Sequence, residues 1–157
     1  MACVPSGCRT VLEFGPGDGV VTRALLDRLP ADGRLLAIET NAEFVETLSG
    51  IHDARLEVVH GSASDTADYA SRSGFAGFDL AVSGIPFSML SPGTRRSVVS
   101  LVGCLLKPGG VFIVYQPSPL MVKYLKREFA VSTQLALGNV PPYFVMRAVK
   151  PAYDRGN

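Results

Sequence analysis

A loop with glycine at every second position constrains this chain more than any other stretch of its sequence. Residues 11–14 form an apolar run with one acid; Gly15, Gly17 and Gly19 follow, and an apolar pattern with helical spacing starts at Val20. Glycine lets the backbone turn tightly and approach a ligand without a Cβ atom in the way. A strand, a glycine loop and a helix in that order are typical of nucleotide-binding turns in α/β folds, so this loop is a candidate cofactor site.

Short apolar segments alternate with helical patterns along the rest of the chain. Strands are predicted over residues 10–14, 34–39, 56–60, 78–83, 111–115, 129–137 and 143–149. Helices are predicted over residues 20–29, after Asn41, from Pro92 onwards and over 120–127, and residues 62–77 are predicted as a loop with a weak helix. This alternation predicts a parallel sheet with helices on both faces, followed by an antiparallel hairpin. The 157 residues suffice for one domain and are too few for two, so residues 1–157 are predicted to form a single domain.

The ends and the cysteines of the chain bear on its location and on metal binding. The first ten residues lack the basic start and apolar core of a signal peptide, and no apolar run reaches the ~20 residues that cross a bilayer. A cytoplasmic location is therefore expected. Cys3 and Cys8 have no third or fourth ligand near them in the sequence, so no metal site is predicted.

The net charge of +1 conceals an uneven distribution. Residues 1–85 contain six basic and twelve acidic side chains, whereas residues 86–157 contain nine basic and two acidic ones. Two interpretations stay open. Either the C-terminal half presents a positive surface to an anionic partner, or the two halves neutralise each other in the fold.

Two acids lie at or near the carboxyl ends of the first two predicted strands. Such sheets bind their ligands at this edge. Glu13 lies inside an apolar strand, where a carboxylate is costly unless it has a partner. Glu39 ends the second strand about 20 residues beyond the glycine loop, where a carboxylate can accept two hydrogen bonds from a ribose diol. Both acids are therefore candidate cofactor ligands.

The spacing of the loop separates two kinds of cofactor. A dinucleotide fingerprint would place its third glycine at Val20, which argues against a nucleotide oxidoreductase. Gly15-x-Gly17-x-Gly19, preceded by Glu13, resembles the first motif of class I S-adenosylmethionine-dependent methyltransferases. The resemblance implies S-adenosyl-L-methionine as cofactor and a Rossmann-like, mostly parallel seven-stranded sheet in the order 3-2-1-4-5-7-6. The cofactor-binding residues that it implies are Glu13, Gly15, Pro16, Gly17, Gly19, Glu39, Thr40, Ser62, Ala63 and Ser83.

The end of the third strand departs from the family pattern. Many members have Gly-Asp-Ala there, and the Asp binds the adenine amino group. This chain has Gly61-Ser62-Ala63, so the adenine contact passes either to Ser62 or to the nearby Asp65.

The loop after the fourth strand resembles the motif with which N-methyltransferases orient an amine. It consists of Ser83, Gly84, Ile85, Pro86 and Phe87, to which we assign amine positioning, with no general base. A neutral amine needs only to be held in line with the methyl group, and positioning can supply most of the acceleration. Ribosomal RNA adenine dimethylases have an Asn at the position of Gly84, and the missing carboxamide argues against a planar base amine as acceptor.

Bacterial phospholipid N-methyltransferases resemble the chain more closely, over roughly residues 10–150. They share the Ser83-to-Pro86 loop, the Pro-Gly-Gly turn at residues 108–110 and the Asn-x-Pro-Pro turn that starts at Asn139. The resemblance implies an N-methyltransferase that acts on a lipid amine such as phosphatidylethanolamine, with Asn139 and Tyr143 contacting the substrate. An RNA (adenine-N6) methyltransferase and a non-catalytic S-adenosylmethionine-binding module stay open as alternatives.

Such lipid enzymes usually carry a helical segment before the first strand, where this sequence has about ten residues. A peripheral contact with the anionic inner membrane face would then depend on the basic C-terminal half. Residues 120–127 combine basic and apolar side chains, and are expected either to form an interfacial helix or to pack on the sheet as an ordinary amphipathic helix.

Overall fold

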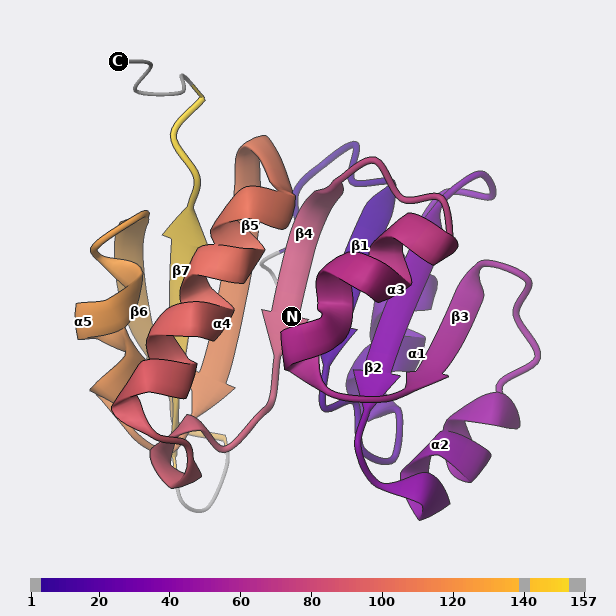
Figure 1. Ribbon diagram of the computed structural model, residues 1–157, viewed down its shortest axis with the longest axis horizontal. Helices are drawn as coiled ribbons and strands as arrows, with labels where there is room; N and C mark the ends of the chain where they lie inside the picture. The colour runs from indigo at the N-terminus through magenta and orange to yellow at the C-terminus, as the bar shows by residue number, and fades with distance from the viewer. Residues whose placement is uncertain (1–3, 139–141, 153–157) are drawn as a thin grey trace.

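A seven-stranded mixed sheet in the order β3-β2-β1-β4-β5-β7-β6 organises the computed structural model, which describes residues 4–138 and 142–152 (Figure 1). The strands are β1 (Thr10–Phe14), β2 (Arg34–Glu39), β3 (Leu56–His60), β4 (Phe78–Ser83), β5 (Leu106–Gln116), β6 (Ala130–Ala136) and β7 (Tyr143–Val149). β1 to β5 pair in parallel, and β7 lies antiparallel between β5 and β6. The predicted fold and strand order are confirmed.

The helices lie on both faces of the sheet, with α1 behind it and α3 and α4 in front in the view of Figure 1. The α-helices are α1 (Val20–Leu26), α2 (Ala42–Ser49), α3 (Thr66–Arg72), α4 (Pro92–Leu105) and α5 (Val122–Leu125). Three short 3₁₀ turns are η1 (Ala63–Asp65), η2 (Phe87–Met89) and η3 (Pro119–Met121). None of the helices in the described ranges is both long and apolar enough to span a bilayer.

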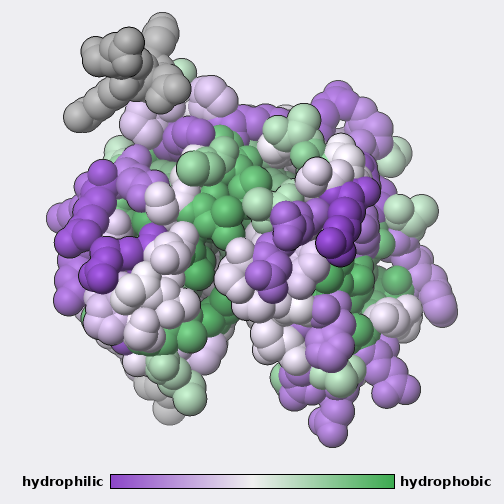
Figure 2. Space-filling view, in the orientation of Figure 1, coloured by the Kyte–Doolittle hydropathy of each residue, from purple (hydrophilic) through white to green (hydrophobic). Residues whose placement is uncertain are grey.

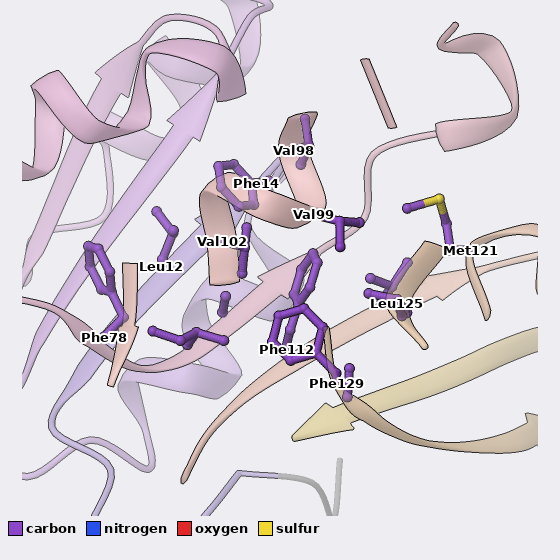
Figure 3. Packing of buried hydrophobic residues seen from close by; sticks show 14 of the residues in the cluster. Leu12, Phe14, Phe78, Val98, Val99, Val102, Phe112, Met121, Leu125 and Phe129 are labelled. Carbon is purple, nitrogen blue, oxygen red and sulfur yellow. The ribbon is translucent and has the colours of Figure 1, made fainter. Parts of the chain in front are cut away.

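Alternation along the central strands divides the buried side chains between the two faces. Leu12 and Phe14 of β1 join the cluster under α4, whereas Val11 joins the cluster with Leu25 and Leu26 of α1. Figure 3 shows the α4 cluster, in which valines of α4 face Phe14 and Phe112. Parallel strands that are buried on both faces are expected to be apolar at nearly every position, as these are. Glu13 is the exception within β1.

Two helices begin as their sequences predict. Asn41 caps α2, because its side chain accepts a hydrogen bond from the backbone N–H of Glu43. Ser91 caps α4 in the same way through the N–H of Thr94, and Pro92 occupies the first turn, where a missing N–H has no cost.

The structure differs from the prediction around residues 106–110. We expected a helix end and a turn before a strand at Val111; instead α4 ends at Leu105 and β5 already starts at Leu106. Gly109 takes a left-handed φ of +76°, and the register against β4 shifts between Phe78 and Leu80. The Pro-Gly-Gly sequence therefore forms an irregularity inside the strand pairing. Residues 62–77 are also more helical than predicted, since η1 and α3 occupy much of that segment.

The segment predicted as a helix over residues 120–127 is split into η3 and the single turn of α5. Its apolar side chains are enclosed by the protein: Met121, Tyr124 and Leu125 are all buried and belong to the α4 cluster. Leu120 and Val122 are partly buried and pack against the same cluster. This packing favours the alternative of an amphipathic segment on the sheet over an interfacial helix. Lys123, Lys126 and Arg127 remain exposed on its outer side.

The described ion pairs bear on the uneven charge distribution. Three of the four join residues within the N-terminal half, and one, from Lys107 Nζ to Asp79 Oδ1 at 2.8 Å, connects the two halves. Direct neutralisation between the halves is therefore slight among the described residues. This favours the interpretation in which the C-terminal half presents positive charge at its surface.

Candidate functional site

The carboxyl ends of the parallel strands meet at one edge of the sheet, which is the lower edge in Figure 1. Figure 2 shows the molecular surface notched at this edge, between the part that carries α2 and the part that carries α4 and α5. Another hollow, of about 460 Å³, lies at the opposite edge beside residues 4–9 and Arg28, and includes no part of the glycine loop. The notch at the carboxyl edge is where an open α/β sheet binds its ligand.

The glycine loop adopts the conformation that its sequence predicts. Gly15, Gly17 and Gly19 have φ values of +62°, +57° and +82°, a region that other residues rarely enter. A Cβ atom at Gly15 would lie 3.3 Å from Cγ1 of Ile85, so the loop after β1 packs closely on the loop after β4. A Cβ at Gly17 would meet nothing within 4 Å, which leaves space above the backbone at that position.

Backbone hydrogen bonds hold the strand ends together around this loop. The N–H of Gly15 donates to the carbonyl of Ile38 at 3.0 Å, and the N–H of Gly84 donates to the carbonyl of Phe14 at 3.1 Å. The N–H of Gly61 donates to the carbonyl of Glu39 at 2.9 Å. The loops that follow β1, β3 and β4 are thus fixed relative to one another before any side chain acts.

Glu13 is almost completely buried and faces α1. Its Oε2 accepts a hydrogen bond from the Thr22 hydroxyl at 2.8 Å, and its Oε1 has no partner among the described residues. Burial raises the pKa of Glu13 to about 7, the Thr22 hydrogen bond opposes that shift, and the nearby charge of Glu39 adds to it. A buried carboxyl oxygen without a partner beside the glycine loop fits a cationic or hydrogen-bonding ligand, directly or through water.

Glu39 is buried and fastens the end of β2 to the glycine loop. Its Oε2 accepts from the N–H of Gly17 at 3.1 Å, and its Oε1 accepts from the N–H groups of Thr40 at 2.8 Å and Asn41 at 2.9 Å. The sequence predicted a carboxylate at this place but not these backbone contacts. Because a carboxylate offers about four acceptor sites, Glu39 can still receive a ligand hydroxyl.

The residues at the ends of β2 and β3 that we predicted to contact the cofactor lie beside one another. Thr40 is exposed, and its carbonyl is 3.0 Å from Nε2 of His60, the last residue of β3. The Ser62 hydroxyl caps η1 by accepting from the N–H of Ser64 at 3.3 Å. Ala63 packs against the α4 cluster. The Ser62 hydroxyl also accepts from the Ser64 hydroxyl at 2.9 Å, so both of its acceptor sites are in use and its predicted adenine contact stays a prediction.

The loop after β4 is supported from inside the protein. Ser83 and Phe87 are fully buried, and the Ser83 hydroxyl accepts from the N–H of Ile85 at 3.3 Å. Arg95 of α4 holds the far end of the loop, because its Nε donates to the Phe87 carbonyl at 2.8 Å and its Nη2 to the Ser88 carbonyl at 3.0 Å. Sequence reasoning missed Arg95, which only the folding of α4 back onto the loop places there.

Gly84 lies under the side chain of Tyr115, which comes from the neighbouring strand β5. A Cβ atom at Gly84 would collide with the Tyr115 hydroxyl and would stand 2.8 Å from Cζ and 3.2 Å from Cε2 of the ring, so the side chain would have to shift. The Tyr115 ring meets Tyr143 edge to face, with centroids 6.3 Å apart and planes at 79°. The predicted substrate residue Tyr143 is therefore brought to the amine-positioning loop through Tyr115. Asn139 lies outside the described residues.

Two further polar side chains at the end of β5 were missed by sequence reasoning. Tyr115 is one, and Gln116 is the other. Gln116 is buried; its Nε2 donates to the Ser118 carbonyl at 2.7 Å, and its Oε1 has no partner among the described residues. The available signal was their position, since both follow the apolar run of residues 111–114 where that strand reaches the ligand-binding edge.

Residues 11–110 match the family model described as "Methyltransferase domain". The chain belongs to this methyltransferase family. The match covers the glycine loop, the three strand ends that follow it and the loop after β4. The methyltransferase is therefore an enzyme that uses S-adenosylmethionine, and its partnerless Glu13 oxygen and the space above Gly17 fit such a cofactor.

Individual relatives of the methyltransferase agree with this assignment. It is 28% identical to the ornithine lipid N-methyltransferase of Singulisphaera acidiphila over 152 residues, which cover 92% of this chain and 79% of that protein. It is 33% identical to the probable ribosomal RNA small subunit methyltransferase A of Methanospirillum hungatei over 88 residues, or 56% of this chain and 32% of that protein.

A solved structure has the same fold. The N-methyltransferase NodS of Bradyrhizobium japonicum, in complex with S-adenosyl-L-homocysteine, superposes with a TM-score of 0.74 at 15% identity. The superposition covers 92% of this chain and 79% of NodS. At this identity the likeness supports the Rossmann-like methyltransferase architecture and carries no information about the acceptor.

Proposed function

We propose that this enzyme transfers a methyl group to the amine headgroup of a membrane lipid, with phosphatidylethanolamine as the leading acceptor. The observation that carries the proposal is the loop after β4, where Gly84 offers no side chain to a base amine and lies under an aromatic ring. Support comes from the ornithine lipid N-methyltransferase, which matches nearly the whole chain. We assign the cofactor to the predicted residues around Glu13, the glycine loop and Glu39.

For methyl transfer to a neutral amine, the main task of the protein is to position the amine against the methyl group. When bound, S-adenosylmethionine supplies an electrophilic methyl group and leaves as a neutral thioether. Backbone carbonyls of residues 83–87 accept hydrogen bonds from the amine, which aims its lone pair, and the methylated nitrogen passes one proton to water. Arg95 keeps that loop in place through the carbonyls of Phe87 and Ser88. Positioning of this kind accounts for about 7–11 kcal/mol of barrier reduction in favourable cases.

A lipid acceptor requires contact with a membrane surface. We assign this contact to the exposed basic side chains in and beside α5, namely Lys123, Lys126 and Arg127. Each basic group near an anionic surface adds roughly 1 kcal/mol of attraction, which salt screens. Replacement of all three by Gln is expected to weaken sedimentation with phosphatidylglycerol vesicles and leave cofactor binding unchanged.

The test is a methyl-transfer assay with labelled cofactor across three acceptor pools. The pools are vesicles that contain phosphatidylethanolamine or ornithine lipid, small-subunit ribosomal RNA, and soluble small amines. Label in the lipid fraction alone supports the proposal. Label in RNA alone, or in the small amines alone, rejects it. Titration with S-adenosylhomocysteine in parallel verifies that the protein is folded and binds its cofactor.

An RNA adenine methyltransferase is the second candidate, and the identity to the small subunit methyltransferase A of Methanospirillum hungatei favours it. That match spans 56% of this chain and about a third of the relative, so it reaches less of the chain than the lipid enzyme does. A non-catalytic cofactor-binding module has less support, because the chain is a methyltransferase by family.

A further inference from the structure

We call the ends of β1 and β2 the donor side of the carboxyl edge, and the ends of β4 and β5 its acceptor side. Tyr115 belongs to the acceptor side, at the end of β5. Its ring occupies the space over Gly84, which follows β4. Its side chain also lies within electrostatic range of Glu13 and Asp18 of the donor side, and of Tyr143, since all three raise its pKa. Tyr115 therefore lies against the amine-positioning loop and within electrostatic reach of the end of β1 and the glycine loop.

The Tyr115 hydroxyl is available to a ligand. It is not among the enclosed, partnerless polar atoms, and no hydrogen bond contributes to its pKa among the described residues. The residue as a whole is half-buried. The hydroxyl end of Tyr115 rests against Gly84 and its ring meets Tyr143, so the hydroxyl has a fixed position at low entropic cost.

We propose, resting on the function proposed above, that the Tyr115 hydroxyl accepts a hydrogen bond from the acceptor amine and so orients its lone pair. Gly84 leaves the room that this arrangement needs, and β5 supplies a side-chain contact in addition to the backbone carbonyls of the β4 loop. Tyr115 is thus a specificity-determining contact for amines that still carry an N–H. A tertiary amine has no N–H, and gains nothing from the hydroxyl.

The state of the phenol is consistent with this role. Burial and the nearby negative groups raise the pKa of Tyr115 to about 12, so the hydroxyl stays neutral near pH 7 and does not act as a base. A neutral hydroxyl accepts an N–H and leaves the nitrogen lone pair free. The faces of Tyr115 and Tyr143 also suit the ammonium product, because aromatic rings attract cations.

The experiment compares three acceptors with one to three methylations remaining. Phosphatidylethanolamine and its monomethyl and dimethyl derivatives are each presented in phosphatidylglycerol vesicles, and kcat and KM are measured for the intact protein and for Tyr115→Phe. We expect kcat to fall about tenfold for the primary and secondary amines, the equivalent of one hydrogen bond. For the dimethyl lipid, kcat of Tyr115→Phe should change less than twofold. The affinity for S-adenosylhomocysteine and the melting temperature should be unchanged.

Tyr69→Phe is the matched control. The Tyr69 ring covers Gly61 as Tyr115 covers Gly84, because a Cβ atom there would lie 2.6 Å from its Cζ, but at the end of β3. If Tyr69→Phe changes kcat, we expect it to change kcat by the same factor for all three acceptors. A uniform factor for Tyr115→Phe as well, or a change in KM alone, overturns the inference and leaves the proposed function intact. If the unmodified protein methylates none of the three lipids, the inference falls, and the proposed function falls with it unless ornithine lipid takes up label in the assay above.

Discussion

The donor side and the acceptor side of the carboxyl edge are built by different means. On the donor side, at the ends of β1 and β2, the glycine loop has three left-handed residues, and the Glu39 carboxylate accepts from three backbone N–H groups. On the acceptor side, at the ends of β4 and β5, Gly84 supplies only space, which Tyr115 fills from the next strand. The donor side is specified by short local sequence, whereas the acceptor side depends on packing between segments far apart in the chain.

Glu39→Ala should have the largest effect and acts on the donor side alone. It removes the acceptor of the Gly17, Thr40 and Asn41 N–H groups, and the carboxylate proposed to bind ribose. Hydrogen bonds to a charged group contribute about 1.5–3 kcal/mol each, so affinity for S-adenosylhomocysteine should fall at least about 100-fold. Isothermal titration calorimetry measures it.

Glu43→Ala is the control for this loss, since Glu43 is an exposed acid of α2 in the same segment. It should bind the ligand as the unmodified protein does. The affinity of Glu39→Gln, which keeps one acceptor oxygen, should lie between those of Glu39→Ala and Glu43→Ala. If Glu39→Ala and Glu43→Ala bind S-adenosylhomocysteine with equal affinity, Glu39 does not contribute to the donor side, and the contrast between the two sides is wrong.

Gly84→Ala should have the next largest effect and acts on the acceptor side. Gly84 does not have a left-handed φ, so the backbone tolerates alanine and the cost comes from collision with the hydroxyl and ring of Tyr115. Overpacking of this kind costs about 1–3 kcal/mol, which lowers the melting temperature by several degrees. Methyl transfer should fall about 100-fold through displacement of the reacting groups, with ligand affinity nearly unchanged.

A double-mutant cycle isolates the contact between these two residues. In a Tyr115→Ala background the added methyl group has room, so Gly84→Ala should cost less than about 0.5 kcal/mol of unfolding free energy. Thermal and urea unfolding of the four proteins give the coupling. If Gly84→Ala lowers the free energy of unfolding by the same amount in both backgrounds, Tyr115 does not fill this space.

The individual strands were predictable because the physical signals are local, whereas their order in the sheet followed from the family resemblance. Runs such as residues 78–83 and 34–39 are apolar enough for strands buried on both faces, and Asn41 and Ser91 mark helix starts through their own side chains. The errors fell where packing overrides such signals. Gly109 adopts a left-handed φ that lets the strand continue through the Pro-Gly-Gly sequence, for which a turn was predicted. Burial of Leu125 fixes the basic segment against the protein, a choice that the sequence left open.

The candidate site divides along the same line. Gly15, Gly17 and Glu39 could be found from spacing, since their roles follow from the strand-loop-helix unit that contains them. Arg95 and Tyr115 could not, because each acts on a loop that another element supplies. No periodicity in the sequence encodes which ring will cover Gly84.

Glu13→Gln should have a smaller, pH-dependent effect on the donor side. The pKa of Glu13 rises from its ordinary value of 4.5 to about 7 in the folded protein, so the folded state binds more protons than the unfolded state between these values. Its contribution to stability is therefore fully present below the unfolded pKa and is lost as pH rises through the folded pKa. From about pH 5 to 7 the protein should lose about 2 kcal/mol relative to Glu13→Gln, which has no such proton to lose.

Chemical denaturation of both proteins across this pH range measures the difference. A cationic ligand group next to Glu13 would favour the carboxylate, so cofactor binding near pH 6 should also release close to one proton in the unmodified protein and almost none in Glu13→Gln. Calorimetry in buffers of different ionisation enthalpy detects this release. Parallel stability curves for the two proteins would place the Glu13 pKa near its ordinary value.

Ser62 should give the smallest change, and it tests how far the donor side extends along the edge. Its hydroxyl caps η1, and our prediction adds a hydrogen bond to the adenine amino group. One neutral hydrogen bond contributes about 1 kcal/mol, so Ser62→Ala should weaken S-adenosylhomocysteine binding about fivefold. Ser62→Asp keeps a capping oxygen and offers a stronger acceptor, so it should bind the ligand more tightly than the unmodified protein. If both substitutions weaken binding equally, the cap at η1 is the whole role of Ser62, and the donor side ends at β2.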